Sequence, residues 1–288
     1  MAATVDAILQ TRYSDNILLQ VQQLTSRIVP TVFQKPDCQG AIEYQDQIAT
    51  HEASEKTSRN QKIENIDPTY DHRKIIPRFF YVAPLIDTMD KLMMCKDPSS
   101  EVVQSNAGAL ARKQETVLCV AFRANAYSGT AGTTANSLPT GQIIVHSSAG
   151  LNMVKIRAAH QILDENEVPV ENRHLAMTAE QVGNLLAITE VTSSDYAQVK
   201  ALVSGQPGTL CGFSIVRSER LEKSSTTRYC MAYHKTGMVL GTWLDLNTRI
   251  DRRPDLVGSP WQLNAEQSYG ATRLEEKKVV QIECTEIA

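Results

Sequence analysis

Residues Gly150 to Leu221 decide the fold, and they read GLNMVKIRAAHQILDENEVPVENRHLAMTAEQVGNLLAITEVTSSDYAQVKALVSGQPGTLCGFSIVRSERL. Apolar side chains recur at helical spacing in the first part of this stretch, at Leu151, Val154, Ala158, Ile162 and Leu163. The helix should end near Asn166, because the Val168-Pro169 pair follows and proline disfavours α geometry in the residue before it. The stretch therefore begins with one amphipathic helix.

A strand and a second helix follow directly. His174 to Met177 is a short apolar run, which predicts a strand. Thr178 can cap the next helix, with Gln181 reaching back from three residues on, and the apolar face of that helix is Val182, Leu185 and Leu186. Three glycines then bracket a turn around Pro207, namely Gly205, Gly208 and Gly212. Phe213 to Ser218 continue as a strand.

The bulk composition indicates a globular chain. With 288 residues, 42% of them hydrophobic, the chain can bury a sizeable core as one large or two ordinary domains. Its 29 basic and 32 acidic residues give a net charge of −3, so no overall positive field attracts it to nucleic acid or an anionic membrane. Any contact with DNA should therefore be local.

The cysteines and the apolar runs indicate a reducing compartment and no membrane anchor. No C-x-x-C spacing occurs among the six cysteines, which argues against a zinc site or a disulfide framework: Cys38, Cys95, Cys119, Cys211, Cys230 and Cys284. We expect no secretory leader at Met1 and no membrane span, because no apolar run approaches the ~18 residues that a membrane helix needs.

A polar stretch and a long helix precede the stretch that opens this section. Residues 44–74 read YQDQIATHEASEKTSRNQKIENIDPTYDHRK, which has too few large apolar residues for a core of its own. Two interpretations stay open: disorder, or a two-stranded hairpin ordered by a partner surface, with Ile42, Tyr44 and Ile63 marking its arms.

The long helix should run from about Ser99 to Asn125, after a shorter helix at 87–95. Ser99 is a plausible cap, and Glu101 sits where the helix dipole favours an anion. One apolar stripe is expected at Val103, Ala107, Leu110, Val117, Leu118 and Ala121. Three charged residues should lie near or on the solvent face: Arg112, Lys113 and Glu115.

Catalytic chemistry is weakly indicated. The sharpest enzymatic hypothesis is a cysteine nucleophile with a histidine base, drawn from Cys211, Cys230, His160, His174 and His234. Each of these cysteines sits in an apolar run typical of a strand, which favours a buried structural thiol, and His160 should be solvated. No phosphate-binding loop or calcium loop is present in the sequence, so we expect no catalytic residue, cofactor or metal. The sequence favours an interaction protein.

The order of these features resembles the major capsid proteins of tailed bacteriophages, which have the Hong Kong 97-like coat fold. The features shared are a helix ending in an acidic run, Val168-Pro169, Arg173 opening a short strand, a second helix, and a Gly-x-x-Gly turn into Gly212-Phe213-x-Ile215 and Ser218. The resemblance covers the chain from about Gln20 to its end.

This resemblance implies an α+β fold with five segments. They are an N-terminal arm at 1–35, an extended hairpin called the E-loop at 36–78, a peripheral domain at 79–170 with a spine helix at about 99–125, an axial domain at 171–266, and a return to the peripheral domain at 267–288. Ser268-Tyr-Gly-Ala271 and the closing strand, Val280 to Cys284, would form that return.

The resemblance also implies a role in assembly. The chain would form hexamers and pentamers of an icosahedral head in the virion, after assembly in the host cytoplasm. Its partners would be other copies of itself, scaffold, portal and decoration proteins, and packaged double-stranded DNA contacted non-specifically, with no membrane. Subunit contacts are expected at Lys56, Arg59, Lys62 and Arg73, without covalent cross-linking. Two alternatives stay open: the shell of a bacterial nanocompartment of the same fold, and a cytosolic enzyme.

Overall fold

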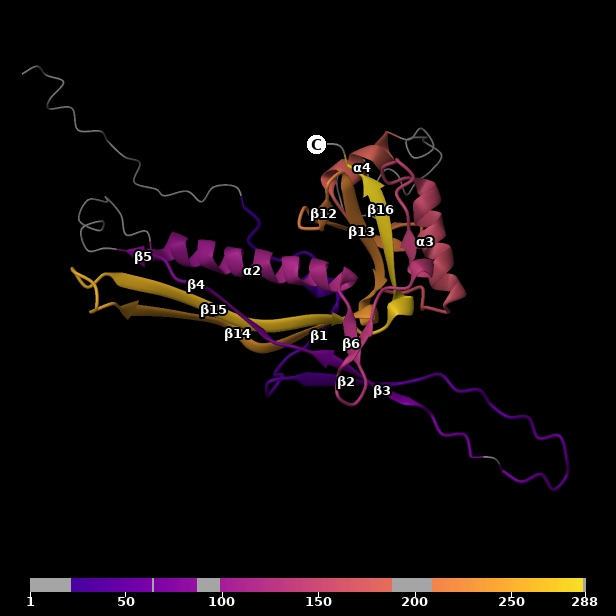
Figure 1. The fold of residues 1–288 in the computed structure, drawn as a ribbon. Coiled ribbons are helices and arrows are strands. Elements are labelled where there is room, and N and C mark those ends of the chain that lie inside the picture. Colours follow the sequence, from indigo (N-terminus) through magenta and orange to yellow (C-terminus); the bar gives the residue numbers. More distant parts are fainter. Residues whose placement is uncertain (1–21, 64, 87–98, 188–208, 287–288) are drawn as a thin grey trace, which may run out of the picture. The chain divides into compact units, whose positions relative to one another are not determined.

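A computed structural model describes residues 22–63, 65–86, 99–187 and 209–286 (Figure 1). The chain divides into two compact units. Unit 1 comprises residues 1–25, 79–112 and 245–267, and unit 2 comprises residues 26–78, 113–244 and 268–288. The predicted helix at 87–95 and the predicted turn at Gly205 to Gly208 lie outside the described residues, as does most of the predicted arm.

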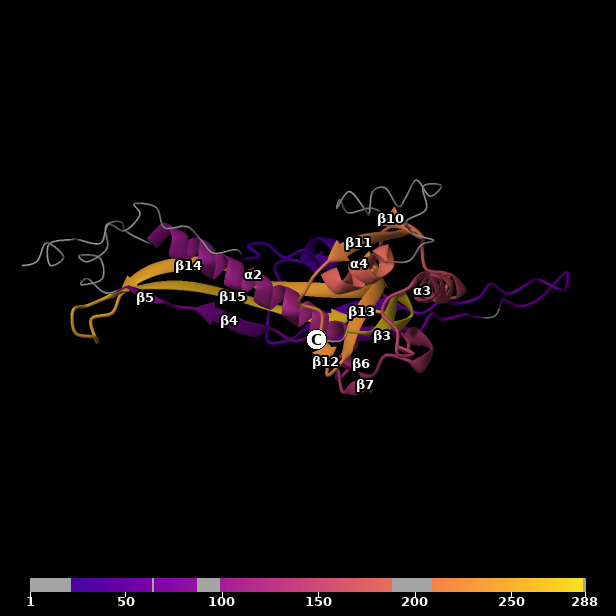
Figure 2. The same cartoon turned by 90° about the horizontal axis from the view of Figure 1, so that it is seen from above.

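A seven-stranded sheet forms the core of unit 2. In spatial order its strands are β10 (Thr209–Leu210), β11 (Phe213–Arg217), β9 (Arg173–Met177), β13 (Thr227–His234), β16 (Val279–Thr285) and β8 (Ile143–Ile144), with β12 (Lys223–Ser224) paired to β13. Helix α3 (Met153–Glu165) packs beside β16, and α4 (Ala179–Leu186) connects onward from β9 (Figures 1 and 2). The predicted order of helix, strand, helix and strand is confirmed.

The closing strand, β16, belongs to the seven-stranded sheet of unit 2. Its seven residues pair antiparallel with β13, from Thr227 opposite Thr285 to Tyr233 opposite Val279. The predicted return of this strand to the peripheral domain stays a prediction. The alternation of Val280 and Ile282 with Gln281 suggested a half-buried strand, yet Gln281 is buried too and accepts a hydrogen bond from Arg123 Nε at 3.3 Å.

Helix α4 is capped by a residue from another loop. Thr178 occupies the N-cap position, but its side chain makes no capping hydrogen bond. Glu219 Oε1 instead accepts from the Ala179 amide at 2.6 Å, and Gln181 Oε1 accepts from the Leu151 amide at 2.7 Å. The predicted capping box is therefore wrong, and Gln181 joins the start of α3 to α4.

Lys155 on α3 is buried and holds the beginning of its helix in place. Its Nζ lies within hydrogen-bond distance of four carbonyl oxygens, which belong to His146, Ala149, Gly150 and Glu283 at 2.8 to 3.1 Å. Burial lowers the pKa of this ammonium group. The charge remains tolerable because carbonyl dipoles replace the water that it loses.

The C-terminus of the described chain is held by an ion pair. Glu286 accepts from Arg228 Nε at 2.9 Å and from the Thr178 hydroxyl at 3.3 Å, and it is almost completely buried. These hydrogen bonds from Arg228 lower the pKa of Glu286 from 4.5 to about 2. The folded state therefore holds this carboxyl ionised under conditions where the unfolded chain would protonate it.

We predict an acid-dependent loss of stability from this pair. A folded pKa below the unfolded value gives a contribution that is complete above pH 4.5 and is lost as the pH falls towards 2. Glu286→Gln should lower the free energy of unfolding by about 2 to 3 kcal/mol at pH 7, and the deficit relative to wild type should shrink by pH 3. Urea unfolding at both pH values measures this, with the exposed Glu165→Gln as control. A deficit that is equal at pH 7 and pH 3 would contradict the prediction.

A four-stranded antiparallel sheet also belongs to unit 2. Its order is β2 (Glu43–Ile48), β3 (Tyr70–Ile75), β6 (Ala126–Ser128) and β7 (Thr134–Asn136). Gly129 and Gly132, at positive φ, form the turn that joins β6 to β7. This sheet carries the polar stretch that the sequence singled out.

The predicted long helix is confirmed as α2 (Ser99–Arg123), whose residues belong to both units. A five-stranded sheet likewise has residues in both: its order is β1 (Phe33–Lys35), β14 (Met238–Arg252), β15 (Trp261–Arg273) and β4 (Arg78–Val82), with β5 (Leu85–Ile86) paired to β15. Within unit 1, Asn106 Nδ2 of α2 donates to the Leu263 carbonyl of β15 at 3.3 Å. Among the described residues, no helix is long and apolar enough to cross a membrane.

The predicted axial range, 171–266, includes residues of both units. Residues 171–244 belong to unit 2, whereas 245–267 belong to unit 1 together with the first half of α2. The reason is the length of β14, a single strand of 15 residues that continues past the boundary of unit 2. Regular strand patterning gives no sign of such a boundary in the sequence.

Glu115 on α2 is buried, although the sequence placed it near solvent. Its Oε2 accepts from the Arg27 amide at 2.9 Å and from the Ser26 hydroxyl at 3.1 Å, and its Oε1 accepts from the Ser218 hydroxyl. A charge buried in this way needs several donors, and these come from segments distant in the sequence. The helical periodicity therefore could not identify it.

Candidate functional site

The polar stretch forms a hairpin with an ordered base. Strands β2 and β3 pair over six residues each, from Glu43 opposite Ile75 to Ile48 opposite Tyr70 (Figure 1). The Ala49 amide donates to the Thr69 carbonyl at 2.8 Å and closes the paired region. Tyr44, predicted to mark the first arm of the hairpin, lies in β2. Ile63, predicted to mark the second arm, lies outside both strands and is 99% exposed.

Contacts within unit 2 fix the base of the hairpin. Gln47 Nε2 donates to the Leu274 carbonyl at 2.7 Å, and the Lys35 ammonium pairs with Glu43 at 2.7 Å. Arg73 is only 7% exposed, and its guanidinium donates to Glu276 Oε2 at 2.7 Å. Arg73 therefore differs from the other three residues predicted for subunit contacts, because its side chain is buried and bonded to a residue of its own chain.

The loop beyond the paired strands, residues 49–69 and called the hairpin loop below, is almost wholly exposed at the positions that the structure describes, 49–63 and 65–69. It carries Lys56, Arg59 and Lys62, and none of these three forms an ion pair with another residue in the described ranges. The hydrogen bonds of the loop are local, as between the Thr57 amide and Gln61 Oε1 at 2.7 Å. A segment that makes so few contacts with its own chain is free to bind another molecule.

Sequence reasoning did not assign the apolar side chains of this hairpin to subunit contacts. Ile48 and Tyr70 lie directly opposite each other where the paired strands end, and both are exposed. Ile63 and Ile66 are exposed further along the hairpin loop. A large apolar residue inside a strongly polar stretch was the available signal, because buried apolar anchors dominate the energy of protein interfaces.

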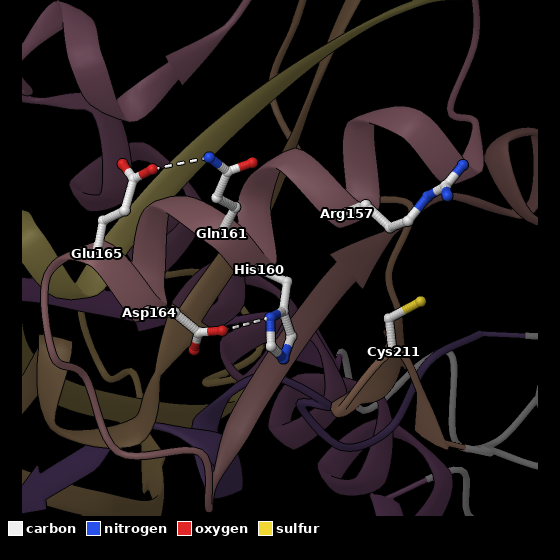
Figure 3. Close-up of a pocket in the computed structure, with 6 residues that line it drawn as sticks. All are labelled: Arg157, His160, Gln161, Asp164, Glu165 and Cys211. Atoms are coloured by element: carbon white, nitrogen blue, oxygen red, sulfur yellow. Dashed lines mark hydrogen bonds and ion pairs between the residues drawn. The ribbon is translucent and has the colours of Figure 1, made fainter.

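Cys211, the residue at the centre of the enzymatic hypothesis, lies beside a shallow pocket of about 360 Å³. The pocket is lined by Arg157, His160, Gln161, Asp164, Glu165 and Cys211 (Figure 3). His160 Nδ1 pairs with Asp164 Oδ2 at 2.8 Å, and its ring packs edge-on against Phe213. The Cys211 sulfur points away from the imidazole of His160 (Figure 3). Burial raises the pKa of the Cys211 thiol, which keeps it protonated and a poor nucleophile.

The other predicted catalytic residues are no closer to a reactive arrangement. The prediction that Cys211 lies in a strand was wrong, because this residue lies in a turn at positive φ. Cys230 is in β13, as its apolar run predicted, and is fully buried. A hydrogen bond with Cys284, together with burial, raises the pKa of the Cys230 thiol. Burial lowers the pKa of both His174 and His234. Within the described ranges, no cysteine sulfur is hydrogen-bonded to a histidine, and no cluster of side chains could hold a metal ion.

Comparison with known proteins places this arrangement among shell-forming proteins. A family model described as phage capsid protein matches residues 5–286. A search of curated proteins found no match. The structure is similar to the capsid of cyanophage P-SCSP1u, with a TM-score of 0.77 and 14% identity over 100% of this chain and 96% of that chain.

Two further solved structures show the same fold. The capsid of Ralstonia phage GP4 has a TM-score of 0.76 and 10% identity, over 100% of this chain and 98% of that one. The capsid of Helicobacter pylori bacteriophage KHP30 has a TM-score of 0.73 and 11% identity, over 97% of this chain and 96% of that one. The predicted α+β coat fold is confirmed.

Proposed function

The chain belongs to the phage capsid protein family, and from this premise we propose that it assembles into hexamers and pentamers that close an icosahedral head around the phage genome. It is a structural protein with a capsid-forming role, and it is located in the virion capsid. The observation that supports the finer proposal is the hairpin, which combines an anchored base with an exposed loop.

The hairpin loop supplies a contact that one subunit cannot complete. Both ends of the loop continue from the paired strands β2 and β3, so the loop leaves the sheet in a defined direction. A loop of this kind loses less conformational entropy on binding than an untethered segment does. When every subunit places its loop on the next copy, the head-to-tail contact repeats around a ring, and a suitable rotation closes the ring.

Each contact in such a shell can be modest. Interfaces of roughly 1,000 to 2,000 Å² dissociate and re-form during assembly, which allows incorrectly placed subunits to leave. The closed shell is stable because each subunit is held by several neighbours at once. We assign subunit contacts to Lys56, Arg59 and Lys62, and we assign Arg73 to the base that holds the loop in position.

The two units suggest a revised domain division. Unit 1, with the first half of α2 and the parts of β14 and β15 within 245–267, is proposed as the peripheral domain. The seven-stranded sheet of unit 2, including β16, is proposed as the axial domain. We further propose assembly in the host cytoplasm, with scaffold, portal and decoration proteins as partners. Packaged double-stranded DNA would be contacted only locally, because the net charge is −3.

Shortening the hairpin loop tests the proposal. We predict that replacing residues 50–69 with a short turn leaves a folded, soluble chain, because β2, β3 and the Arg73–Glu276 pair are retained. Under conditions in which the wild-type chain forms particles, this variant should form none by negative-stain microscopy and light scattering. A second variant should keep the loop at full length with glycine and serine throughout, and it should fail in the same way. Wild-type particles from either variant would overturn the proposal.

A further inference from the structure

Three arginines of unit 2 are brought together by the buried carboxylate of Glu115. The Arg27 amide donates to Glu115 Oε2 at 2.9 Å, and the Ser218 hydroxyl donates to Glu115 Oε1. Ser218 directly follows Arg217, and its Oγ accepts from the Arg220 amide at 3.1 Å. These hydrogen bonds use backbone amides and a serine hydroxyl, so one acid fixes the backbone at all three arginines and leaves their guanidinium groups available.

The guanidinium groups of Arg27, Arg217 and Arg220, called the arginine cluster below, have no acidic partner. Arg27 and Arg220 are exposed, and Arg217 is half-buried. Arg27 Nη1 donates to the Arg217 carbonyl at 3.2 Å, so its guanidinium lies beside the last residue of β11. Within the described part of the chain, none of the three forms an ion pair.

The acidic residues close to the arginine cluster have other partners. Glu219 Oε1 accepts from the Ala179 amide at 2.6 Å, and Glu222 Oε2 pairs with Arg123 Nη1 at 2.6 Å. Glu115 is fully buried beneath its donors. The cluster is therefore a local excess of positive charge on a chain whose net charge is −3. Such an excess attracts an anion at this place although the chain as a whole does not.

We propose that the arginine cluster binds the phosphate backbone of the packaged double-stranded DNA. This inference rests on the proposed function and names the residues at which the shell contacts the genome. A guanidinium donates two parallel hydrogen bonds to a phosphate, and a phosphate contact carries no information about base sequence. A duplex presents a phosphate for about every 1.7 Å of its axis, so one ligand can satisfy all three guanidinium groups.

Fluorescence anisotropy with a short labelled duplex of random sequence tests this proposal on the full-length, unassembled chain. Binding should weaken steeply between about 50 and 200 mM salt, because each neutralised phosphate releases counterions. The triple variant Arg27→Gln, Arg217→Gln and Arg220→Gln should bind about tenfold more weakly or worse at about 50 mM salt. Its slope of log K against log salt concentration should be smaller in magnitude by about 2 to 3.

A matched control removes the same charge from another part of unit 2. Three basic residues there are also exposed and form no ion pair within the described ranges: Arg157, Lys235 and Lys277. Their joint replacement by glutamine should leave the affinity for the duplex within about twofold of wild type, because no shared acid gathers them at one place. Urea midpoints of both triple variants should match wild type, since the backbone hydrogen bonds to Glu115 are retained.

Three results would overturn the assignment to DNA. They are no binding of the duplex by wild type at low salt, equal weakening by the two triple variants, and tighter binding of a polyglutamate peptide than of the duplex, which would make the ligand an acidic protein. The arginine variant should still form particles, and their loss would place the cluster at a subunit contact instead. Wild-type particles after shortening of the hairpin loop would overturn the proposed function, not the affinity for DNA.

Discussion

Replacement of Arg273 by methionine is expected to lower the free energy of unfolding by about 3 to 5 kcal/mol. Arg273 is fully buried, and its guanidinium caps the end of helix α2. Nη1 donates to the carbonyls of Phe122 and Ala124 at 2.7 and 2.6 Å, and Nη2 donates to the Asn136 carbonyl at 2.9 Å. Methionine would fill much of the volume but would leave three carbonyls without these donors, of which that of Phe122 is buried.

The position of this guanidinium explains the size of the effect. The last carbonyls of a helix have no partners within the helix and carry its partial negative charge. Burial lowers the pKa of Arg273, so the protein holds this cation against a desolvation cost. The carbonyls at the end of the helix accept hydrogen bonds from the guanidinium and so offset that cost. Removal of the guanidinium leaves these carbonyls without a donor.

Urea unfolding of the full-length, unassembled chain measures the effect. The control is Arg249→Met, because the Arg249 side chain is 64% exposed and its Nε pairs with Asp251 Oδ2 at 3.1 Å on the surface. Such exposed pairs contribute about 0 to 1 kcal/mol. If the two substitutions lower the urea midpoint equally, Arg273 is not the cap that its geometry indicates.

Gly270→Ala should lower the free energy of unfolding by about 2 to 3 kcal/mol and should also impair assembly. A Cβ atom at this position would lie 2.2 Å from the carbonyl oxygen of Ile76 and 2.9 Å from its carbonyl carbon. Both are backbone atoms, so no side-chain rotation relieves the overlap. The segment between β3 and β4 would have to move, and it joins the proposed assembly hairpin to the five-stranded sheet.

A second glycine provides a control of opposite sign. Gly183 lies in the middle of α4, and a Cβ atom there would meet nothing within 4 Å. Alanine is favoured over glycine inside a helix, so Gly183→Ala should raise the free energy of unfolding by about 0.5 to 1 kcal/mol. Urea midpoints of the two variants, with particle counts by microscopy, test both statements. A Gly270→Ala chain as stable as wild type would show that the close approach to Ile76 is not limiting.

Local patterns predicted the elements of this chain well. The 3.6-residue periodicity and the proline after Val168 predicted α3 and its end, and the apolar run from His174 to Met177 predicted β9. Helix α2 was predicted within two residues of its observed end, because its apolar stripe is continuous. The order of these elements also led to the capsid family, since order along the chain is a property of the sequence alone.

The candidate site was predicted in outline but not residue by residue. Composition identified residues 44–74 as a stretch unable to build its own core, and the exposed hairpin loop agrees with that interpretation. Three of the four charged residues chosen there lie on the exposed loop, whereas Arg73 is buried against Glu276, 203 positions away. The sequence around a basic residue does not show which distant acidic residue will pair with it in the folded chain.

The sequence by itself determined the helices, most strands, the polar character of residues 44–74 and the family, because each depends on neighbouring residues or on their order. Only the tertiary structure decided which charges are buried, which strand β16 joins and where the chain divides. Glu115 and Lys155 look like solvent-facing helix residues, but their partners include Ser218 and Glu283, which lie 103 and 128 positions away. Burial of a charge requires several donors or acceptors to converge, and that convergence exists only once distant segments have packed together.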